Sequence, residues 1–300
     1  MRFNVGEVIT AMVTPMTSTG SVDYAKVEQL AEYLTTNGSD AIVVTGTTGE
    51  SPTLTHEEEI KILHATKRGV KNNAKIVMGT GSNSTTTAVE MSKLAEQEGA
   101  DGILCVVPYY NKPSQKGMIE HFSAIAEAVN IPIILYNIPS RTGVNMSVDT
   151  VKYLTEKYNN IACLKQSYAD MDTITELRMN CPEDFTILSG DDSLTLPMMS
   201  LGVHGVISVA SHVFGKEIKT MITSFKSGYV KKELQIHQKL YPSFRKLFMA
   251  PNPVPVKAVL AHKNMINEYV RKPLTELTED EKNELMATIN STQDSLMALL

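Results

Sequence analysis

The sequence has no tryptophan, no low-complexity segment and only three cysteines in 300 residues. No apolar run approaches the roughly 20 residues that a membrane-spanning helix requires. The opening residues 1–4 also lack the apolar core of a signal peptide. The cysteines, Cys105, Cys163 and Cys181, have no metal-binding spacing. Because two of them lie in apolar, strand-like runs, we expect buried free thiols and a cytoplasmic, reducing location.

An excess of charge of one sign is also lacking. The formal net charge is -5, and acidic and basic residues are interspersed. Basic clusters such as Lys231-Lys232 are short and typical of solvated helix faces, so neither nucleic acid nor a membrane is an expected partner. A hydrophobic fraction of 42% provides a large core, either for one α/β barrel or for two smaller domains.

Short apolar runs alternate with helix-like segments along the first three quarters of the chain. Three glycines, Gly38, Gly99 and Gly202, suit a left-handed helix C-cap and lead directly into the next run. Eight runs within about 220 residues predict parallel strands joined by right-handed crossovers. The runs are 8–13, 41–45, 75–78, 102–107, 133–136, 161–166, 185–188 and 205–209.

Eight such units favour an α/β fold of the (β/α)8 TIM barrel type. A doubly wound open sheet is the alternative, but no Gly-rich dinucleotide-binding loop follows the first strand. Residues 215–300 are mostly helix-like, with breaks expected at Pro242 and at 251–255. We therefore expect a barrel over residues 1–225 and a helical C-terminal extension over residues 226–300 that packs on it.

The sixth predicted strand has a lysine close to its C-terminal end. Its apolar run follows the turn residues Asn159-Asn160 and places Lys165 at the C-terminal end of a buried strand. A buried amine is costly unless it is paired or neutral, and a neutral lysine is a nucleophile that forms an imine with a ketone. A lysine that extends to water from the strand end is the alternative.

Other polar residues follow the other strands, where barrel enzymes place their catalytic groups. The loop 46–51 offers hydroxyls and backbone N–H groups that suit a carboxylate or an oxyanion. Tyr136 ends the fifth strand, where a phenol can transfer protons. Arg141 follows a proline turn and can bind a carboxylate in bidentate fashion. For each of these residues, taken alone, a packing or surface role is the alternative.

No metal site is expected. Asp191 and Asp192 could bind a divalent cation, but an aspartate just before Ser193 is typical of a helix N-cap. No cluster of carboxylates or histidines joins this pair, and the seven histidines are scattered. The pattern counts against a metal-dependent aldolase or hydrolase.

Six motifs stand at the strand ends and in the extension: Gly46-Thr47-Thr48-Gly49-Glu50-Ser51, Pro108-Tyr109-Tyr110-Asn111-Lys112-Pro113, Tyr136-Asn137-Ile138-Pro139-Ser140-Arg141-Thr142-Gly143, Leu164-Lys165, Gly205-Val206-Ile207-Ser208 and Asn252-Pro253-Val254-Pro255-Val256-Lys257. Together they closely resemble the dihydrodipicolinate synthase family of the pyruvate-dependent class I aldolase superfamily. The lysine, the tyrosine and the Gly-Thr-Thr-Gly-Glu loop are shared with N-acetylneuraminate lyase and the keto-deoxy-sugar-acid aldolases.

The resemblance implies a catalytic set. Lys165 would form an imine with pyruvate, and Tyr136 would donate and accept protons, with Thr47 and Tyr110 completing a hydroxyl relay. Tyr110 would reach in from a neighbouring subunit, which implies a tight dimer within a homotetramer. No cofactor and no metal ion are implied, because the covalent imine forms with the substrate itself.

The resemblance also implies a binding set. Thr48, with Thr47, would hold the pyruvate carboxylate, and Ile207 would contribute a main-chain contact. Gly190, at the end of the seventh strand, completes the expected substrate-binding residues. Arg141 would bind the carboxylate of L-aspartate 4-semialdehyde, so the expected reaction is condensation to 4-hydroxy-tetrahydrodipicolinate in lysine and diaminopimelate biosynthesis.

The residues after the lysine depart from the family pattern. Glu-Ala-Ser or Glu-Ala-Thr is common there, but this sequence has Gln166-Ser167-Tyr168. The change leaves open a sister lyase that acts on a sugar acid. A barrel that only binds a small keto acid is a further alternative, although binding alone requires no imine-forming lysine.

The positions of the family's lysine-feedback site match only in part. Glu59 stands where histidine is common, and Thr87 stands where a glutamate usually holds the amine of lysine. Without that carboxylate we expect weak or absent feedback inhibition. The matching positions are Ser51, His56, Asn83 and Tyr109.

Overall fold

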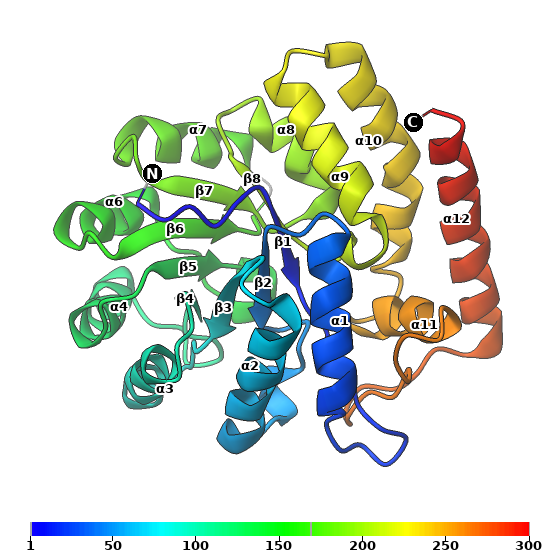
Figure 1. Cartoon of the computed structure of the whole chain (residues 1–300). Coiled ribbons are helices and arrows are strands. Elements are labelled where there is room, and N and C mark those ends of the chain that lie inside the picture. Colours follow the sequence, from blue (N-terminus) through cyan, green and yellow to red (C-terminus); the bar gives the residue numbers. More distant parts are fainter. Residues whose placement is uncertain (1, 169, 300) are drawn as a thin grey trace. The chain divides into compact units, whose positions relative to one another are not determined.

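In a computed structural model of the chain, eight strands follow one another in sequence order around a closed barrel (Figure 1). The structure describes residues 2–168 and 170–299. Helices connect the strands, so the predicted (β/α)8 barrel is confirmed. The strands are β1 (Val8–Ala11), β2 (Ala41–Val44), β3 (Lys75–Gly79), β4 (Gly102–Val106), β5 (Ile133–Asn137), β6 (Ile161–Gln166), β7 (Thr186–Ser189) and β8 (Gly205–Ser208).

Several of the helices begin at a residue whose side chain caps them. Asp23 is the N-cap of α1 and accepts a hydrogen bond from the backbone N–H of Lys26. Across the described residues, no helix combines the length and the apolar character needed to cross a membrane. The helices are α1 (Tyr24–Thr36), α2 (His56–Val70), α3 (Thr85–Gln97), α4 (Gln115–Ala128), α5 (Pro139–Thr142), α6 (Val148–Lys157), α7 (Met171–Asn180), α8 (Thr195–Met199), α9 (Ser211–Lys226), α10 (Val230–Lys246), α11 (Val254–His262) and α12 (Glu279–Met297), with the 3-10 helices η1 (Ser51–Thr53) and η2 (Asp192–Leu194).

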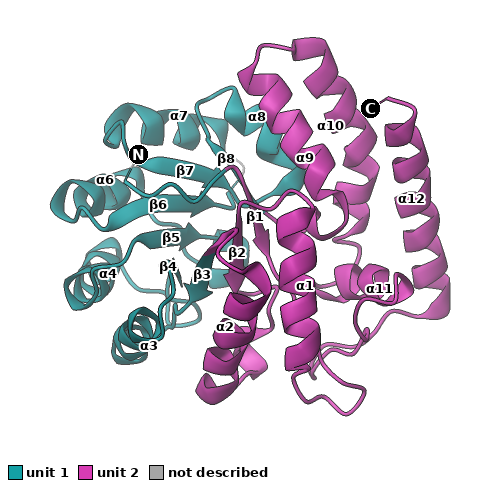
Figure 2. Ribbon diagram, viewed as in Figure 1, with its two compact units in different colours: residues 1–6, 76–207 teal, residues 7–75, 208–300 magenta. Residues whose placement is uncertain are grey.

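The chain forms two compact units, shown in different colours in Figure 2. The first unit comprises residues 1–6 and 76–207, and the second comprises residues 7–75 and 208–300. Three helices, α10, α11 and α12, follow the last helix of the alternating pattern, α9. The expected boundary at residue 225 between barrel and extension stays a prediction.

In the first unit, the middle strands are buried along their whole length. Every residue of β5, β6 and β7 is buried, which explains why their sequences are continuous apolar runs rather than alternating patterns. The strands pair in parallel, so Tyr136 of β5 lies beside Lys165 of β6, and Lys165 lies beside Leu188 of β7. This register determines which side chains meet at the C-terminal ends of the strands.

In the second unit, α10 corrects one expectation from the sequence. The break predicted at Pro242 does not occur, because α10 continues from Val230 to Lys246 with the proline inside it. Proline removes one backbone hydrogen bond and costs about 3 kcal/mol in a helix interior. Ile236 and Leu240 before the proline and Phe244 after it are all buried, so the apolar face on both sides of the proline offsets that loss.

The three glycines predicted to end helices all have positive φ, with values of 101° at Gly38, 79° at Gly99 and 90° at Gly202. Gly38 is also packed against backbone. A Cβ at that position would lie 2.6 Å from the carbonyl carbon of Gly215. Both the left-handed conformation and this close approach therefore require glycine at residue 38.

Candidate active site

Lys165 and Tyr136 are directly opposite each other at the ends of two neighbouring strands. Their side chains point to the same side of the sheet, and Lys165 Nζ lies 4.2 Å from the centre of the Tyr136 ring. Only 7% of Lys165 and 5% of Tyr136 are exposed. Within the described part of the first unit, the amine of Lys165 contacts the Tyr136 ring, and no carboxylate forms an ion pair with this amine. A buried amine without a carboxylate partner, beside a phenol, has the features of an imine-forming nucleophile.

Gly190 lies next to this pair because β7 follows β6 in the barrel. Its backbone N–H donates a 2.8 Å hydrogen bond to the carbonyl oxygen of Gln166. A Cβ at residue 190 would lie 1.8 Å from Ser167 Oγ and 3.0 Å from Lys165 Cε. The absent side chain therefore leaves space for the lysine and the serine. Ile207 is buried at the end of the next strand, β8.

Ser167 was not singled out by the sequence as a functional residue. Its Oγ is buried and makes no hydrogen bond within residues 2–168 and 170–299. A methyl group placed at residue 190 would touch both this hydroxyl and Lys165 Cε, so the two groups border the same small space. A buried hydroxyl without a partner is uncommon in proteins, and a bound substrate would satisfy it.

Gln166 has a different role from its neighbours. Successive residues of a strand point to opposite faces, so Gln166 points away from the side of Lys165. Its Oε1 accepts a 3.1 Å hydrogen bond from Asn137 Nδ2, and Asn137 also bonds to Asn145 at 2.7 Å. Of the residues that depart from the family pattern, Ser167 is therefore the one whose side chain lies on the same side as Lys165.

Tyr110 and Arg141 are on exposed loops of the first unit. Tyr110 follows β4, has a φ of 71° and is 89% exposed, so its phenol makes little contact with its own chain. Arg141 is exposed in the short helix α5, which ends at Gly143 with a φ of 75°. Within the described residues, neither side chain contacts Lys165 or Tyr136. For Tyr110 this agrees with the expectation that it acts in the site of a neighbouring subunit.

Asp191 caps the short 3-10 helix η2 that follows β7. Asp191 Oδ1 accepts 2.8 Å hydrogen bonds from the N–H and the hydroxyl of Ser193. An aspartate N-cap is therefore confirmed, at Asp191, and Asp192 is the first residue of η2. Among residues 2–168 and 170–299, no group of three or more histidine, cysteine, aspartate or glutamate side chains is arranged to bind a metal ion.

The cysteines are buried free thiols, as predicted. Burial raises the pKa of Cys163 to about 12 and that of Cys105 to about 11. These thiols remain protonated near neutral pH, so neither has the thiolate character of a nucleophile.

In the second unit, the loop after β2 carries Thr47 and Thr48. The loop is closed by hydrogen bonds from the N–H of Glu50 to the carbonyl oxygen of Thr47 and from the N–H of Ser51 to that of Gly46. Thr48 is 4% exposed, and its Oγ1 accepts a 2.8 Å hydrogen bond from Asn252. Thr47 is half-buried.

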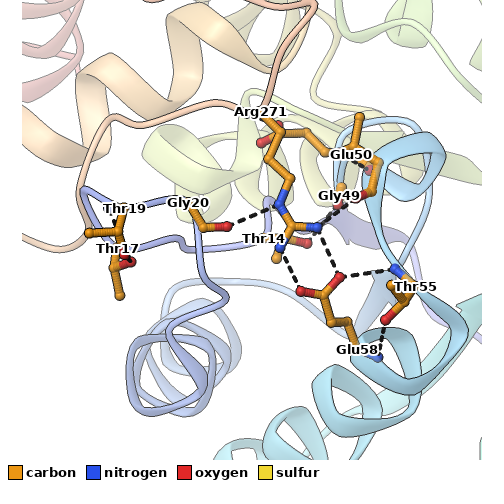
Figure 3. Close-up of polar contacts among 10 residues, drawn as sticks. Thr14, Thr17, Thr19, Gly20, Gly49, Glu50, Thr55, Glu58 and Arg271 are labelled. Carbon is orange, nitrogen blue, oxygen red and sulfur yellow. Dashed lines mark hydrogen bonds and ion pairs between the residues drawn. The ribbon is translucent and has the colours of Figure 1, made fainter.

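The end of this loop is held by a group of ionic contacts. Glu50 Oε1 accepts from Lys257 Nζ at 2.6 Å, and Glu50 Oε2 accepts from the N–H of Arg271 at 2.9 Å. Figure 3 shows the Arg271 guanidinium between Glu58 and the carbonyl oxygen of Gly20. The hydrogen bond from Arg271 lowers the pKa of Glu58 to about 2, whereas burial lowers the pKa of Lys257 and Glu50 opposes this shift.

A (β/α)8 barrel with a buried lysine on β6, beside a tyrosine on β5, is an arrangement suited to a lyase that forms an imine with its substrate. Residues 4–292 match the model of the dihydrodipicolinate synthetase family, and the chain belongs to that family. It is 47% identical to a 4-hydroxy-tetrahydrodipicolinate synthase from Moorella thermoacetica, over 96% of this chain and 98% of the relative.

Solved structures of relatives have the same fold. A dihydrodipicolinate synthase from Cyanidioschyzon merolae, solved with lysine bound, has a TM-score of 0.94 and 44% identity, with coverage of 96% of this chain and 98% of that chain. A chloride-inhibited dihydrodipicolinate synthase from Acinetobacter baumannii, complexed with pyruvate, has a TM-score of 0.93 and 36% identity, with coverage of 96% and 99%.

Proposed function

We propose that this chain condenses pyruvate with L-aspartate 4-semialdehyde to give 4-hydroxy-tetrahydrodipicolinate, the first committed step of diaminopimelate and lysine biosynthesis. The family membership and the names of its relatives support the reaction. The observation that carries the mechanism is the buried Lys165 amine, 4.2 Å from the centre of the Tyr136 ring. A cytoplasmic location, in keeping with three free thiols, is part of the proposal.

The reaction begins when the Lys165 amine attacks the keto carbon of pyruvate. Water leaves and an imine forms, which withdraws electrons, so the methyl group of pyruvate loses a proton to give an enamine. The enamine carbon attacks the aldehyde carbon of the second substrate. The amino group of that substrate then attacks the imine carbon, closes the ring and releases Lys165. Each step uses groups of the chain and its substrates, so the reaction requires no cofactor or metal ion.

Proton transfer in these steps is assigned to hydroxyl groups. Tyr136 is next to the amine and transfers protons during imine formation and enamine formation. Thr47 and Tyr110 continue the relay. Because the Tyr110 side chain is 89% exposed in a single chain, we assign it to the site of a second copy. This assignment requires a tight dimer, within an expected homotetramer.

The two substrates are bound by different groups. Thr47 and Thr48 hold the pyruvate carboxylate, and the main chain at Ile207 and Gly190 borders the reacting carbon. The guanidinium of Arg141 binds the carboxylate of aspartate semialdehyde in bidentate fashion. This arginine distinguishes the proposed substrate from a sugar aldehyde, which has no carboxylate in that place.

The aldehyde assignment is tested by a coupled assay in which the downstream reductase consumes NADPH. We expect turnover with pyruvate and aspartate semialdehyde, and Arg141→Lys should raise KM for the semialdehyde by about tenfold or more, because a lysine cannot form the paired contact. KM for pyruvate should stay unchanged. The matched control is Arg245→Lys on the exposed side of α10. Equal KM values in wild type and Arg141→Lys would remove the arginine from the site.

A related lyase that cleaves a sugar acid to pyruvate and an aldehyde is the second candidate. The buried, unpartnered Ser167 hydroxyl beside Lys165 favours it, since a polyhydroxylated aldehyde would satisfy such a group. Release of pyruvate from N-acetylneuraminate or from a 2-keto-3-deoxy acid, without turnover of aspartate semialdehyde, would establish this alternative.

We also propose that feedback inhibition by lysine is weak or absent. Thr87 is the third residue of α3, where its N–H and hydroxyl bond to the N-cap Ser84. It offers no carboxylate to an amine. Glu59 does not replace that charge, because burial raises its pKa to about 8 and the carboxyl is therefore largely protonated at neutral pH.

This proposal predicts that millimolar L-lysine leaves turnover nearly unchanged in the coupled assay. Thr87→Glu should introduce inhibition, because a glutamate at the third helix position fits the cap and restores the carboxylate. Thr86→Glu, on the exposed neighbouring residue, is the matched control and should remain insensitive. Inhibition of the wild type at micromolar lysine would contradict the proposal.

A further inference from the structure

The segment 252–271 of the C-terminal extension bonds to the loop after β2 at two residues of that loop. Asn252 bonds to Thr48, and Lys257 and Arg271 bond to Glu50. All five residues belong to the second unit. The extension lies about 200 residues further along the chain, so these contacts are a specific feature of the folded state.

Asn252 determines how the Thr48 hydroxyl can be used. The Nδ2 amide donates to Thr48 Oγ1 at 2.8 Å, and both side chains are buried. A threonine hydroxyl has one proton to donate. Because Asn252 occupies an acceptor position of Thr48 Oγ1, the hydroxyl proton is available for another group, and a carboxylate oxygen is the acceptor with which it forms the strongest bond.

The contacts at Glu50 hold the other end of the loop. Its side chain is 2% exposed and that of Lys257 is fully buried, and Lys257 Nζ also donates to the carbonyl oxygen of Tyr269 at 2.6 Å. Glu50 itself has a φ of 58°. Arg271 extends the anchor to the carbonyl oxygen of Thr53, just beyond the loop. The backbone that follows Thr48 is therefore anchored at Glu50 and Thr53.

From this geometry we propose that Asn252 is a positioning residue for pyruvate, which acts by turning the Thr48 hydroxyl proton toward the substrate carboxylate. The inference rests on the proposed function, in which Thr48 binds that carboxylate. It gives the extension a part in substrate binding, although Asn252 itself does not contact pyruvate.

Asn252→Asp tests the polarity of this contact with almost no change in shape. A carboxylate at residue 252 accepts the Thr48 proton instead of donating to the oxygen, and it adds a negative charge near the substrate anion. We expect KM for pyruvate to rise tenfold or more, because the variant loses a hydrogen bond to the charged carboxylate of the substrate. KM for aspartate semialdehyde should remain unchanged.

The pH dependence supplies a measurement that a purely structural role would not affect. At a pH low enough to protonate the introduced carboxyl, it can again donate to Thr48 Oγ1, so KM of the variant should approach that of the wild type. Asn267→Asp is the matched control, because Asn267 is an exposed residue of the same extension whose Oδ1 accepts from the N–H of Tyr269. This control makes the same change from amide to carboxylate at a residue that does not contact the loop after β2.

Trapping with borohydride tests imine formation with pyruvate separately from the role of Asn252. Wild type incubated with pyruvate and borohydride should gain a covalent adduct, and the pyruvate concentration at half-maximal trapping should be tenfold higher for Asn252→Asp. Wild type that gains no adduct would overturn the proposed function itself. Wild type and Asn252→Asp that trap pyruvate with the same half-maximal concentration would overturn only the role of Asn252.

A second variant answers the same question if Asn252→Asp does not fold. Asn252→Ala removes the donor without adding a charge, so the Thr48 hydroxyl is free to rotate. We expect a smaller rise in KM for pyruvate. Thr48→Val should raise KM less in the Asn252→Ala background than in wild type, because a freely rotating hydroxyl already contributes less to the hydrogen bond with the substrate. Full additivity of the two changes would overturn the proposal.

Discussion

Lys165→Ala should abolish both turnover and the covalent trapping of pyruvate by borohydride. The amine of Lys165 is the atom that bonds to the keto carbon, so its removal eliminates the imine and not merely a binding contact. We expect turnover to fall by several orders of magnitude. Mass spectrometry of the protein after reduction should show the adduct in wild type and none in the variant, and digestion should locate it on Lys165.

Lys165→Arg is the control for charge and volume. It keeps a cation near the Tyr136 ring, but a guanidinium remains protonated and does not form an imine. Loss of trapping in both variants, with the melting temperature of Lys165→Arg close to that of wild type, assigns the loss to chemistry. Pyruvate trapped by Lys165→Ala at the wild-type level would show that another amine is the nucleophile.

The fold and the pair at its centre follow from local patterns in the sequence. Eight apolar runs and the glycines before them indicate parallel strands, and consecutive parallel strands are usually neighbours. Since Tyr136 and Lys165 each stand at the end of a strand in consecutive units, strand order alone predicts that they meet. The N-caps at Asp23 and Asp191 are likewise local, because the capping contact spans only two or three residues.

Other features depend on contacts that local patterns do not encode. The register of β6 and β7 is needed to see that Gly190 leaves room for Ser167. The contacts of Asn252 and Lys257 with the loop after β2 join residues more than 200 positions apart. Both residues lie in the Asn-Pro-Val-Pro-Val-Lys motif, one of the six motifs identified in the sequence. The motif alone does not indicate which residues it contacts.

The error at Pro242 has the same origin. A proline in a helical pattern predicts a break when only the neighbouring residues are considered. Burial of Ile236, Leu240 and Phe244 on both sides of the proline adds a tertiary contribution that local sequence does not reveal. The outcome shows how packing overrides a local preference of about 3 kcal/mol.

Lys257→Met should destabilise the protein more than any surface change. The substitution leaves the Glu50 carboxylate buried at 2% side-chain exposure, with the N–H of Arg271 as its one remaining hydrogen-bond donor among the described residues. Removal of one partner of a buried ion pair costs on the order of 3–5 kcal/mol, because the other charge is left without compensation. The measurement is the unfolding midpoint in denaturant, followed by circular dichroism.

Two further variants separate the charge effect from the loss of a long side chain. Glu50→Gln combined with Lys257→Met removes the uncompensated charge, so the double variant should be more stable than Lys257→Met alone. Lys61→Met is the matched surface control, since Lys61 pairs with Glu57 at 54% and 77% side-chain exposure, and its midpoint should equal that of wild type. If Lys257→Met and Lys61→Met had equal midpoints, the buried pair would make no net contribution to stability. The anchoring of the loop after β2 would then depend on Arg271 and Asn252, because both still reach it when Lys257 is replaced.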